Sequence, residues 1–117
     1  MLNFTGKAVH LACGAYDMRK SINGLSAIVQ GSFDLSPFGE AVFAFCNKNR
    51  DLMKILEWDG DGFWLHTKRL ERGRFRWPSA GDPATMVLTA DEMGHLLGGT
   101  KVARKLVRGE VKAGPVS

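Results

Sequence analysis

The sequence predicts an α+β domain: a mostly antiparallel meander sheet of four to six strands, with one longer helix packed on it and a short C-terminal helix. Three observations predict this class. Short runs rich in aromatic and β-branched residues alternate with tight-turn signals between residues 41 and 77. Residues 18–31 have the apolar spacing of a helix, and a helix start signal appears near residue 89. The gaps between the predicted strands are short enough for hairpins.

The first strand and the longer helix are predicted on the N-terminal side. Residues 7–13 alternate weakly, which is typical of a short strand. Asp17 is a suitable N-cap for a helix over residues 18–31. The apolar side chains of this helix recur at helical spacing: Met18, Ile22, Leu25 and Val29. Arg19 and Lys20 would lie in its first turn, where a cation opposes the helix dipole, so an ion pair or a phosphate contact is expected for them.

The sheet continues through short strands and tight turns. Strands are expected over residues 41–46, 52–58, 63–70, 74–77 and 85–88. The Asp-Gly-Asp-Gly run at residues 59–62 suits a hairpin turn, because Asp-Gly pairs tolerate positive φ. Residues 71–73 are expected to form a second turn, and Pro78 stops the strand that follows it.

The C-terminal part contains the short helix and a basic tail. Thr89 and Glu92 have the spacing of a capping box, which begins a helix to about Leu97. Gly98-Gly99 then ends it. Residues 1–100 are therefore expected to form the single domain, and residues 101–117 either an amphipathic helix or a disordered tail.

Composition limits the class of protein. The chain has 117 residues and two cysteines, Cys13 and Cys46, which lie in apolar runs and are expected to be reduced and buried. No apolar run is long enough for a membrane span, and the N-terminus does not resemble a secretory signal. A soluble cytoplasmic protein is expected. No motif for a zinc site, a P-loop or a dinucleotide is present, so no metal or cofactor is expected.

The net charge of +4 is concentrated in two segments. Between residues 64 and 77, five cations face one acid, and the tail is similarly basic, whereas the rest of the chain is mildly acidic. Segregated positive charge favours a polyanionic partner. The predicted strands at 63–70 and 74–77 would form a two-stranded basic ribbon, which fits a DNA groove or the phosphate backbone. The predicted nucleic-acid-binding residues are Arg19, Lys20, Arg50, Lys68, Arg69, Arg72, Arg74 and Arg76.

Two other functions remain open from the residues themselves. The first is a protein-interaction module that docks on a partner or self-associates, since aromatic residues dominate interface hot spots. Its predicted anchors are Trp58, Phe63, Trp64, Phe75 and Trp77. The second is a metal-dependent nuclease built on Asp59 and Asp61, although Asp-Gly-Asp-Gly is also what a tight turn requires.

Several motifs in one order resemble a known family. They are YDMRK at residues 16–20, KIL at 54–56, WDGDGF at 58–63, KRLERGRF at 68–75 and Trp77-Pro78. This set is similar to the second-reading-frame accessory protein of the insertion-sequence-66 type of bacterial transposable element, often labelled TnpB, over about residues 7 to 98.

The resemblance implies an accessory protein of bacterial DNA transposition rather than an enzyme. Family members are encoded beside a larger transposase that carries the catalytic acids. The expected partners are therefore DNA, at the element ends, and that separate transposase. The resemblance supplies no catalytic residue. The preferred hypothesis is DNA binding through the basic ribbon, and the alternative is docking on the transposase without direct DNA contact.

Overall fold

The structure, a computed structural model, describes residues 6–81 and 83–97. Its elements in chain order are β1 (Val9–Ala12), α1 (Ile22–Gly31), β2 (Val42–Cys46), β3 (Leu52–Trp58), β4 (Phe63–Arg69), β5 (Thr85–Leu88) and α2 (Ala90–Leu97). The basic tail and Gly98-Gly99 lie outside the described residues. No helix within the described residues has the length and apolar character needed to cross a membrane.

The five strands form one sheet in the order β4-β3-β2-β1-β5. β2, β3 and β4 are an antiparallel meander, and β5 pairs antiparallel with β1. β1 and β2 are parallel, because α1 forms the crossover between them. The predicted α+β class, with a mostly antiparallel sheet and two helices, is confirmed. The meander itself is limited to three strands.

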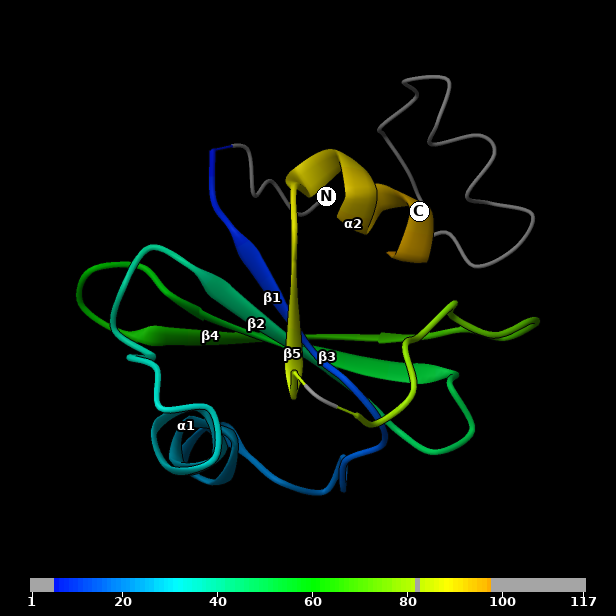
Figure 1. The fold of residues 1–117 in the computed structure, drawn as a ribbon, viewed down its shortest axis with the longest axis horizontal. Coiled ribbons are helices and arrows are strands. Elements are labelled where there is room, and N and C mark those ends of the chain that lie inside the picture. The colour runs from blue at the N-terminus through cyan, green and yellow to red at the C-terminus, as the bar shows by residue number, and fades with distance from the viewer. Residues whose placement is uncertain (1–5, 82, 98–117) are drawn as a thin grey trace.

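The two helices lie on opposite faces of the sheet (Figure 1). On the face that α1 covers, Leu25 and Val29 pack in a cluster with Phe43, Phe45 and Leu56. On the other face, Met93 of α2 packs in a cluster with apolar side chains of β1, β2 and β3. We call these the α1 face and the α2 face. Each strand of the meander contributes alternate side chains to them.

The predicted start of the longer helix is wrong. α1 begins at Ile22, and its N-cap is Ser21, which makes no side-chain capping bond. Asp17 instead closes a separate turn: its Oδ1 accepts the backbone N–H of Arg19 at 2.9 Å. Short polar side chains often stabilise such turns in competition with a helix. Arg19 and Lys20 therefore precede the helix, and the expected opposition to its dipole does not arise.

The predicted strand at residues 74–77 is also wrong, and with it the two-stranded ribbon. Phe75 and Trp77 are only 1% and 5% exposed, in the core of the α2 face. The Trp77 indole N–H donates to the backbone oxygen of Ala12 at 2.8 Å. Because these two rings pack in the core, residues 74–77 lie across the sheet and do not pair with β4 as a neighbouring strand. Their burial also removes Phe75 and Trp77 from the predicted partner-binding surface.

Other local predictions are confirmed. Thr89 and Glu92 form the capping box of α2, with reciprocal bonds of 2.9 and 3.1 Å. Cys13 and Cys46 are free and buried. Burial raises the pKa of the Cys46 thiol to about 11, so this sulfur stays protonated at neutral pH.

Candidate nucleic-acid interface

One end of the sheet collects exposed cations from two segments that are distant in sequence. The connection between β2 and β3, residues 47–51, meets residues 70–77 at this end (Figure 1). We call the resulting surface the basic end. Its exposed cationic side chains are Lys48, Arg50, Arg69, Arg72, Arg74 and Arg76.

Asn47 organises the first of the two segments. Its Oδ1 accepts the backbone N–H groups of Asp51 and Leu52 at 3.0 and 3.1 Å. Its Nδ2 donates to the Asp51 carboxylate at 2.7 Å. The Asp51 carboxylate is thereby bound within its own loop. Sequence reasoning missed this role of Asn47, although asparagine is a common organiser of turns.

Backbone contacts bring the second segment beside the first. The N–H of Leu70 donates to the oxygen of Asp51 at 2.8 Å, and the N–H of Phe75 donates to the oxygen of Arg50 at 2.7 Å. Arg50 has a φ of 62°, the left-handed region that side-chain-bearing residues rarely adopt. The backbone at Arg50 is therefore held in a strained form at the point where the two segments join.

The buried rings determine which way the arginines of residues 74–77 face. Phe75 and Trp77 alternate with Arg74 and Arg76, so burial of the rings leaves both arginines exposed. The predicted alternation is thus correct, although the segment is not a strand. The backbone of this segment is held beside Arg50 by the burial of the two rings and by the bond from Phe75 to Arg50, rather than by a sheet partner.

Little negative charge offsets the basic end. Within the described residues, Arg69 is the arginine of this surface that meets a carboxylate, that of Glu71 at 3.9 Å. Both side chains are well exposed, and a pair of this kind contributes at most about 1 kcal/mol. The remaining guanidinium groups are therefore available to a polyanion.

The other predicted nucleic-acid-binding residues lie differently. The Arg19 guanidinium is paired with Asp17, at 2.8 Å from Oδ2, and this contact holds the pKa of Asp17 well below its usual range. Lys20 is exposed, and its backbone oxygen accepts the Lys54 ammonium at 3.2 Å. Lys68 is half-buried on the α2 face of β4, and desolvation lowers its pKa. These three residues are not part of the basic end.

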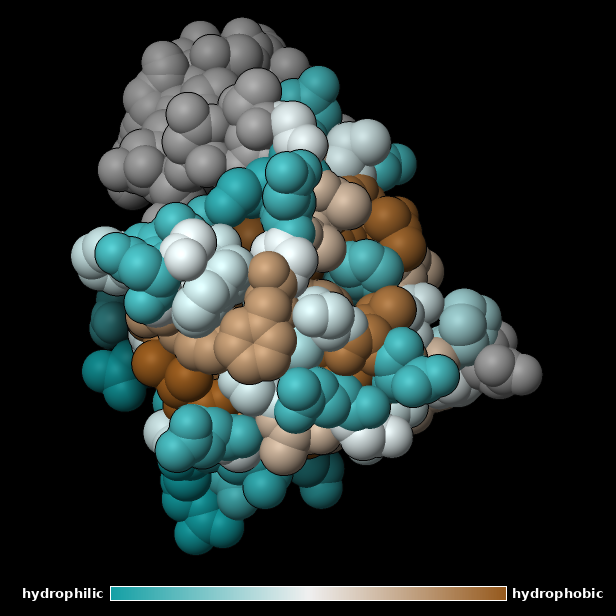
Figure 2. All heavy atoms as spheres, turned by 90° about the vertical axis from the view of Figure 1, so that its left-hand side faces the viewer, coloured by the Kyte–Doolittle hydropathy of each residue, from teal (hydrophilic) through white to brown (hydrophobic). Residues whose placement is uncertain are grey.

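Aromatic side chains gather at the opposite end of the sheet. Trp58 and Phe63, on either side of the β3–β4 turn, lie 4.9 Å apart between ring centroids. Phe38 completes a three-ring cluster, at 5.2 and 5.4 Å from them, and is 52% exposed. Figure 2 looks at this end of the molecule and shows apolar side chains gathered among polar ones. Phe38 was missed from the sequence because it comes from a loop outside the predicted strands.

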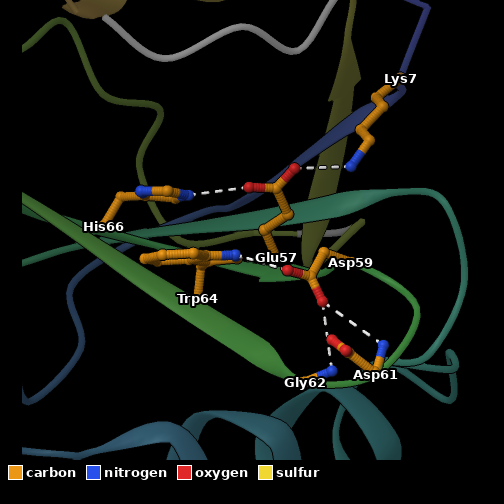
Figure 3. Close-up of polar contacts among 7 residues, drawn as sticks. All are labelled: Lys7, Glu57, Asp59, Asp61, Gly62, Trp64 and His66. Carbon is orange, nitrogen blue, oxygen red and sulfur yellow. Dashed lines mark hydrogen bonds and ion pairs between the residues drawn. The ribbon is translucent and has the colours of Figure 1, made fainter.

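Trp64 is exposed on the other face of β4 and is held in place by polar contacts (Figure 3). Its indole N–H donates to Asp59 Oδ2 at 2.6 Å, and its ring lies parallel to that of His66. His66 contacts Glu57 at 2.8 Å, and Glu57 accepts the Lys7 ammonium at 2.6 Å. Burial would raise the pKa of Glu57, but the bonds from Lys7 and His66 outweigh it and lower the pKa.

The carboxylate of Asp59, one of the two candidate metal ligands, is engaged in hydrogen bonds within its own turn. Asp59 Oδ1 accepts the backbone N–H groups of Asp61 and Gly62 at 3.4 and 3.2 Å, and Oδ2 accepts the indole of Trp64 (Figure 3). The Trp64 indole is the main cause of the lowered pKa of Asp59. In the described part of the chain, no three acidic, histidine or cysteine residues gather in a group that could hold a metal ion. Asp59 acts here as the organiser of the turn.

The fold and the basic end define a small α+β protein with a cationic surface at one end of its sheet and an aromatic cluster at the other. Comparison with known proteins identifies the family to which this chain belongs. The family model described as IS66 Orf2-like protein matches residues 7–106, and this chain belongs to that family. It is thus an accessory-type protein of insertion-sequence-66 elements, as the motifs indicated.

Two proteins of Sinorhizobium fredii are similar to this chain. Uncharacterized protein y4hO is 40% identical over 91 residues, which cover 78% of each chain. Uncharacterized protein y4jC is 34% identical over 110 residues, which cover 92% of this chain and 93% of that protein. No solved structure matches the chain significantly.

The strained backbone at Arg50 leads to a test that separates stability from charge. Arg50→Gly should raise the unfolding free energy by roughly 1 kcal/mol, because glycine adopts positive φ without the penalty of a Cβ. The same substitution removes one cation from the basic end. Urea denaturation measures the first effect and DNA titration the second. Arg50→Ala is the control, since it removes the same charge and retains the strain. Equal stability of the two variants would contradict the left-handed conformation.

Proposed function

We propose that this protein binds DNA through its basic end and thereby assists a separate transposase of the same element. The observation that carries the proposal is the outward display of Arg74 and Arg76 beside Arg50, which follows from the burial of Phe75 and Trp77. Exposed arginines that lack carboxylate partners suit phosphate oxygens, to which a guanidinium can donate two parallel bonds. Contacts of this type give affinity and position rather than sequence specificity.

The protein surface is expected to contact the phosphate backbone of the DNA rather than the base edges. Without the second ribbon strand, the basic end offers arginines from two loops and the end of β4, rather than a ribbon that enters the major groove. The protein would lie against the phosphates and hold element ends in place for the transposase. The transposase would supply the chemistry.

Salt dependence tests this proposal directly. If the basic end neutralises about four phosphates, log affinity should fall against log salt with a slope near −3.6. Between 50 and 200 mM salt the affinity for a labelled duplex would then fall about 150-fold. Fluorescence anisotropy with duplexes of an element end and of unrelated sequence measures this. Absence of binding at the lower salt, or affinity that ignores salt, would refute DNA binding by this surface.

The alternative is docking on the transposase without DNA contact, and the ring cluster of Phe38, Trp58 and Phe63 favours it. Exposed aromatic side chains are typical anchors of protein interfaces. Co-purification of the two proteins from a nuclease-treated lysate separates the two functions. A complex that persists and that Phe38→Ala weakens supports direct docking, whereas loss of the complex after nuclease treatment supports bridging by DNA.

A further inference from the structure

The outer edge of β4 presents backbone groups that the described sheet leaves unpaired, and it meets the basic end at Arg69. In the part of the chain that the structure describes, β4 is the last strand on its side of the sheet and pairs with β3 alone. After Leu70 the chain turns inward, since Leu70 and Phe75 donate to the oxygens of Asp51 and Arg50. Within the described residues, no strand covers this edge. A long edge strand presents unpaired backbone groups that can template a further strand.

The hairpin ladder shows which backbone groups point outward. The N–H of Asp59 donates to Gly62 at one end of the ladder, and the N–H of Leu70 donates to Asp51 at the other. In an antiparallel pair, residues that bond to the partner strand alternate with residues that bond outward. Even-numbered residues of β4 therefore bond to β3. The outward N–H and C=O groups belong to Phe63, Leu65, Thr67 and Arg69.

Charge along this edge is divided between its two ends. The turn before β4 carries Asp59 and Asp61. At the other end, Lys68, Arg69 and Arg72 outnumber Glu71. If two copies of β4 paired antiparallel, the acidic end of each would lie beside the basic end of the other. The edge is thus complementary to itself, whereas a polyanion along its whole length would meet Asp59 and Asp61.

We propose that two copies of this protein pair through β4, antiparallel and centred on His66. This register alone pairs all the outward backbone groups: Phe63 with Arg69 of the second copy, and Leu65 with Thr67. On the α2 face it sets Trp64 opposite Lys68 of the second copy, in a non-hydrogen-bonded pair where side chains approach closely. An aromatic ring of one copy then meets a cation of the other on both faces of the sheet. The pair is Trp64 with Lys68 on the α2 face and Phe63 with Arg69 on the α1 face.

The state of Trp64 and Lys68 in the single chain suits this pairing. Trp64 is 57% exposed, yet Asp59 and His66 fix its orientation, so little side-chain freedom is lost on contact. Lys68 is half-buried and makes no hydrogen bond or ion pair with another described residue. The edge at the other side of the sheet, β5, is only four residues long and offers a shorter ladder.

A proline substitution tests the pairing on the full chain. Thr67→Pro removes an outward N–H but no bond to β3, and an edge strand tolerates proline there. Thr67→Ala is the matched control, because it keeps the N–H. Sedimentation over a concentration series should give a dimer for the wild type and Thr67→Ala, and a monomer for Thr67→Pro, all with the same circular dichroism spectrum. A wild-type monomer at every concentration overturns the proposal, and so does a Thr67→Pro dimer.

Cross-linking checks the register independently. His66→Cys places two thiols directly opposite at the centre of the pair, at a spacing that suits a disulfide. Thr67→Cys places them two positions further apart along the strands. Mild oxidation should therefore link His66→Cys into a dimer and leave Thr67→Cys largely unlinked, while Cys13 and Cys46 are buried and do not interfere. Equal linking of both variants would contradict the register. The Thr67→Pro variant retains every arginine of the basic end, so the sedimentation test of pairing does not depend on DNA binding.

Discussion

Phe75→Ala is expected to lower the free energy of unfolding by about 3–5 kcal/mol, the usual cost of removing a buried phenyl ring. Phe75 is 1% exposed and packs with Trp77 in the core of the α2 face. A domain of this size has a total stability of only about 5–15 kcal/mol, so the loss is large. Urea denaturation followed by circular dichroism measures it.

Phe38→Ala is the matched control for Phe75→Ala. Phe38 is the same residue type but is exposed, and its loss should cost no more than about 1 kcal/mol. Phe75→Ala should also weaken DNA binding, although it removes no charge, because Arg74 and Arg76 lose the anchor between them. Similar stability of the two variants would show that residues 75–77 are not anchored in the core.

Conversion of Arg69, Arg72, Arg74 and Arg76 to alanine is expected to abolish most of the salt-dependent DNA affinity. The log–log slope should shrink by about 3.6 if each guanidinium neutralises one phosphate. All four side chains are exposed, so stability should change by only about 0.5 kcal/mol per site. Anisotropy titration of a labelled duplex at several salt concentrations gives the slope. An unchanged affinity and slope would refute the basic end as the binding surface.

Two controls sharpen this experiment. The corresponding four-lysine variant keeps the charge and should keep the slope, while the loss of bidentate contacts weakens binding by a smaller factor. A second variant removes four cations from the tail instead: Lys101, Arg104, Lys105 and Arg108. If this tail variant loses the salt dependence and the four-alanine variant does not, the tail is the site of DNA contact.

Much of the sheet could be predicted because its signals are local. β3 and β5 have the predicted bounds, since each is a short run of strand-forming residues between turn signals. The parallel pairing of β1 with β2 could not be predicted from these signals, because it depends on how α1 crosses the sheet. Asp17 was misplaced for a related reason: its carboxylate can cap a helix or close a turn, and the sequence does not distinguish the two.

The sequence predicts which arginines belong to the candidate site, but it does not predict the contacts that position them. The alternation of arginines with Phe75 and Trp77 is compatible with an edge strand and with a segment lying across a core. The structure shows the second arrangement, because both rings are buried against residues that are distant in sequence. The sequence indicates Arg50 by its charge alone, whereas the place of Arg50 beside the segment of Arg74 and Arg76 follows from one backbone bond, in which Phe75 donates to Arg50. Trp58 and Phe63 are at the surface, but their neighbour Phe38 lies far away in sequence.

The position of β1 between β2 and β5 has a consequence for the order of folding. The β2–β3–β4 meander needs only neighbouring segments, so it is expected to form early, whereas β1 must wait for closure of the long loop that contains α1. Trp77 binds the backbone of β1 at Ala12, so its docking belongs to the late stage. A nascent chain would therefore fix Arg76, which is next to Trp77 in sequence, in its final place only after β1 has joined the meander.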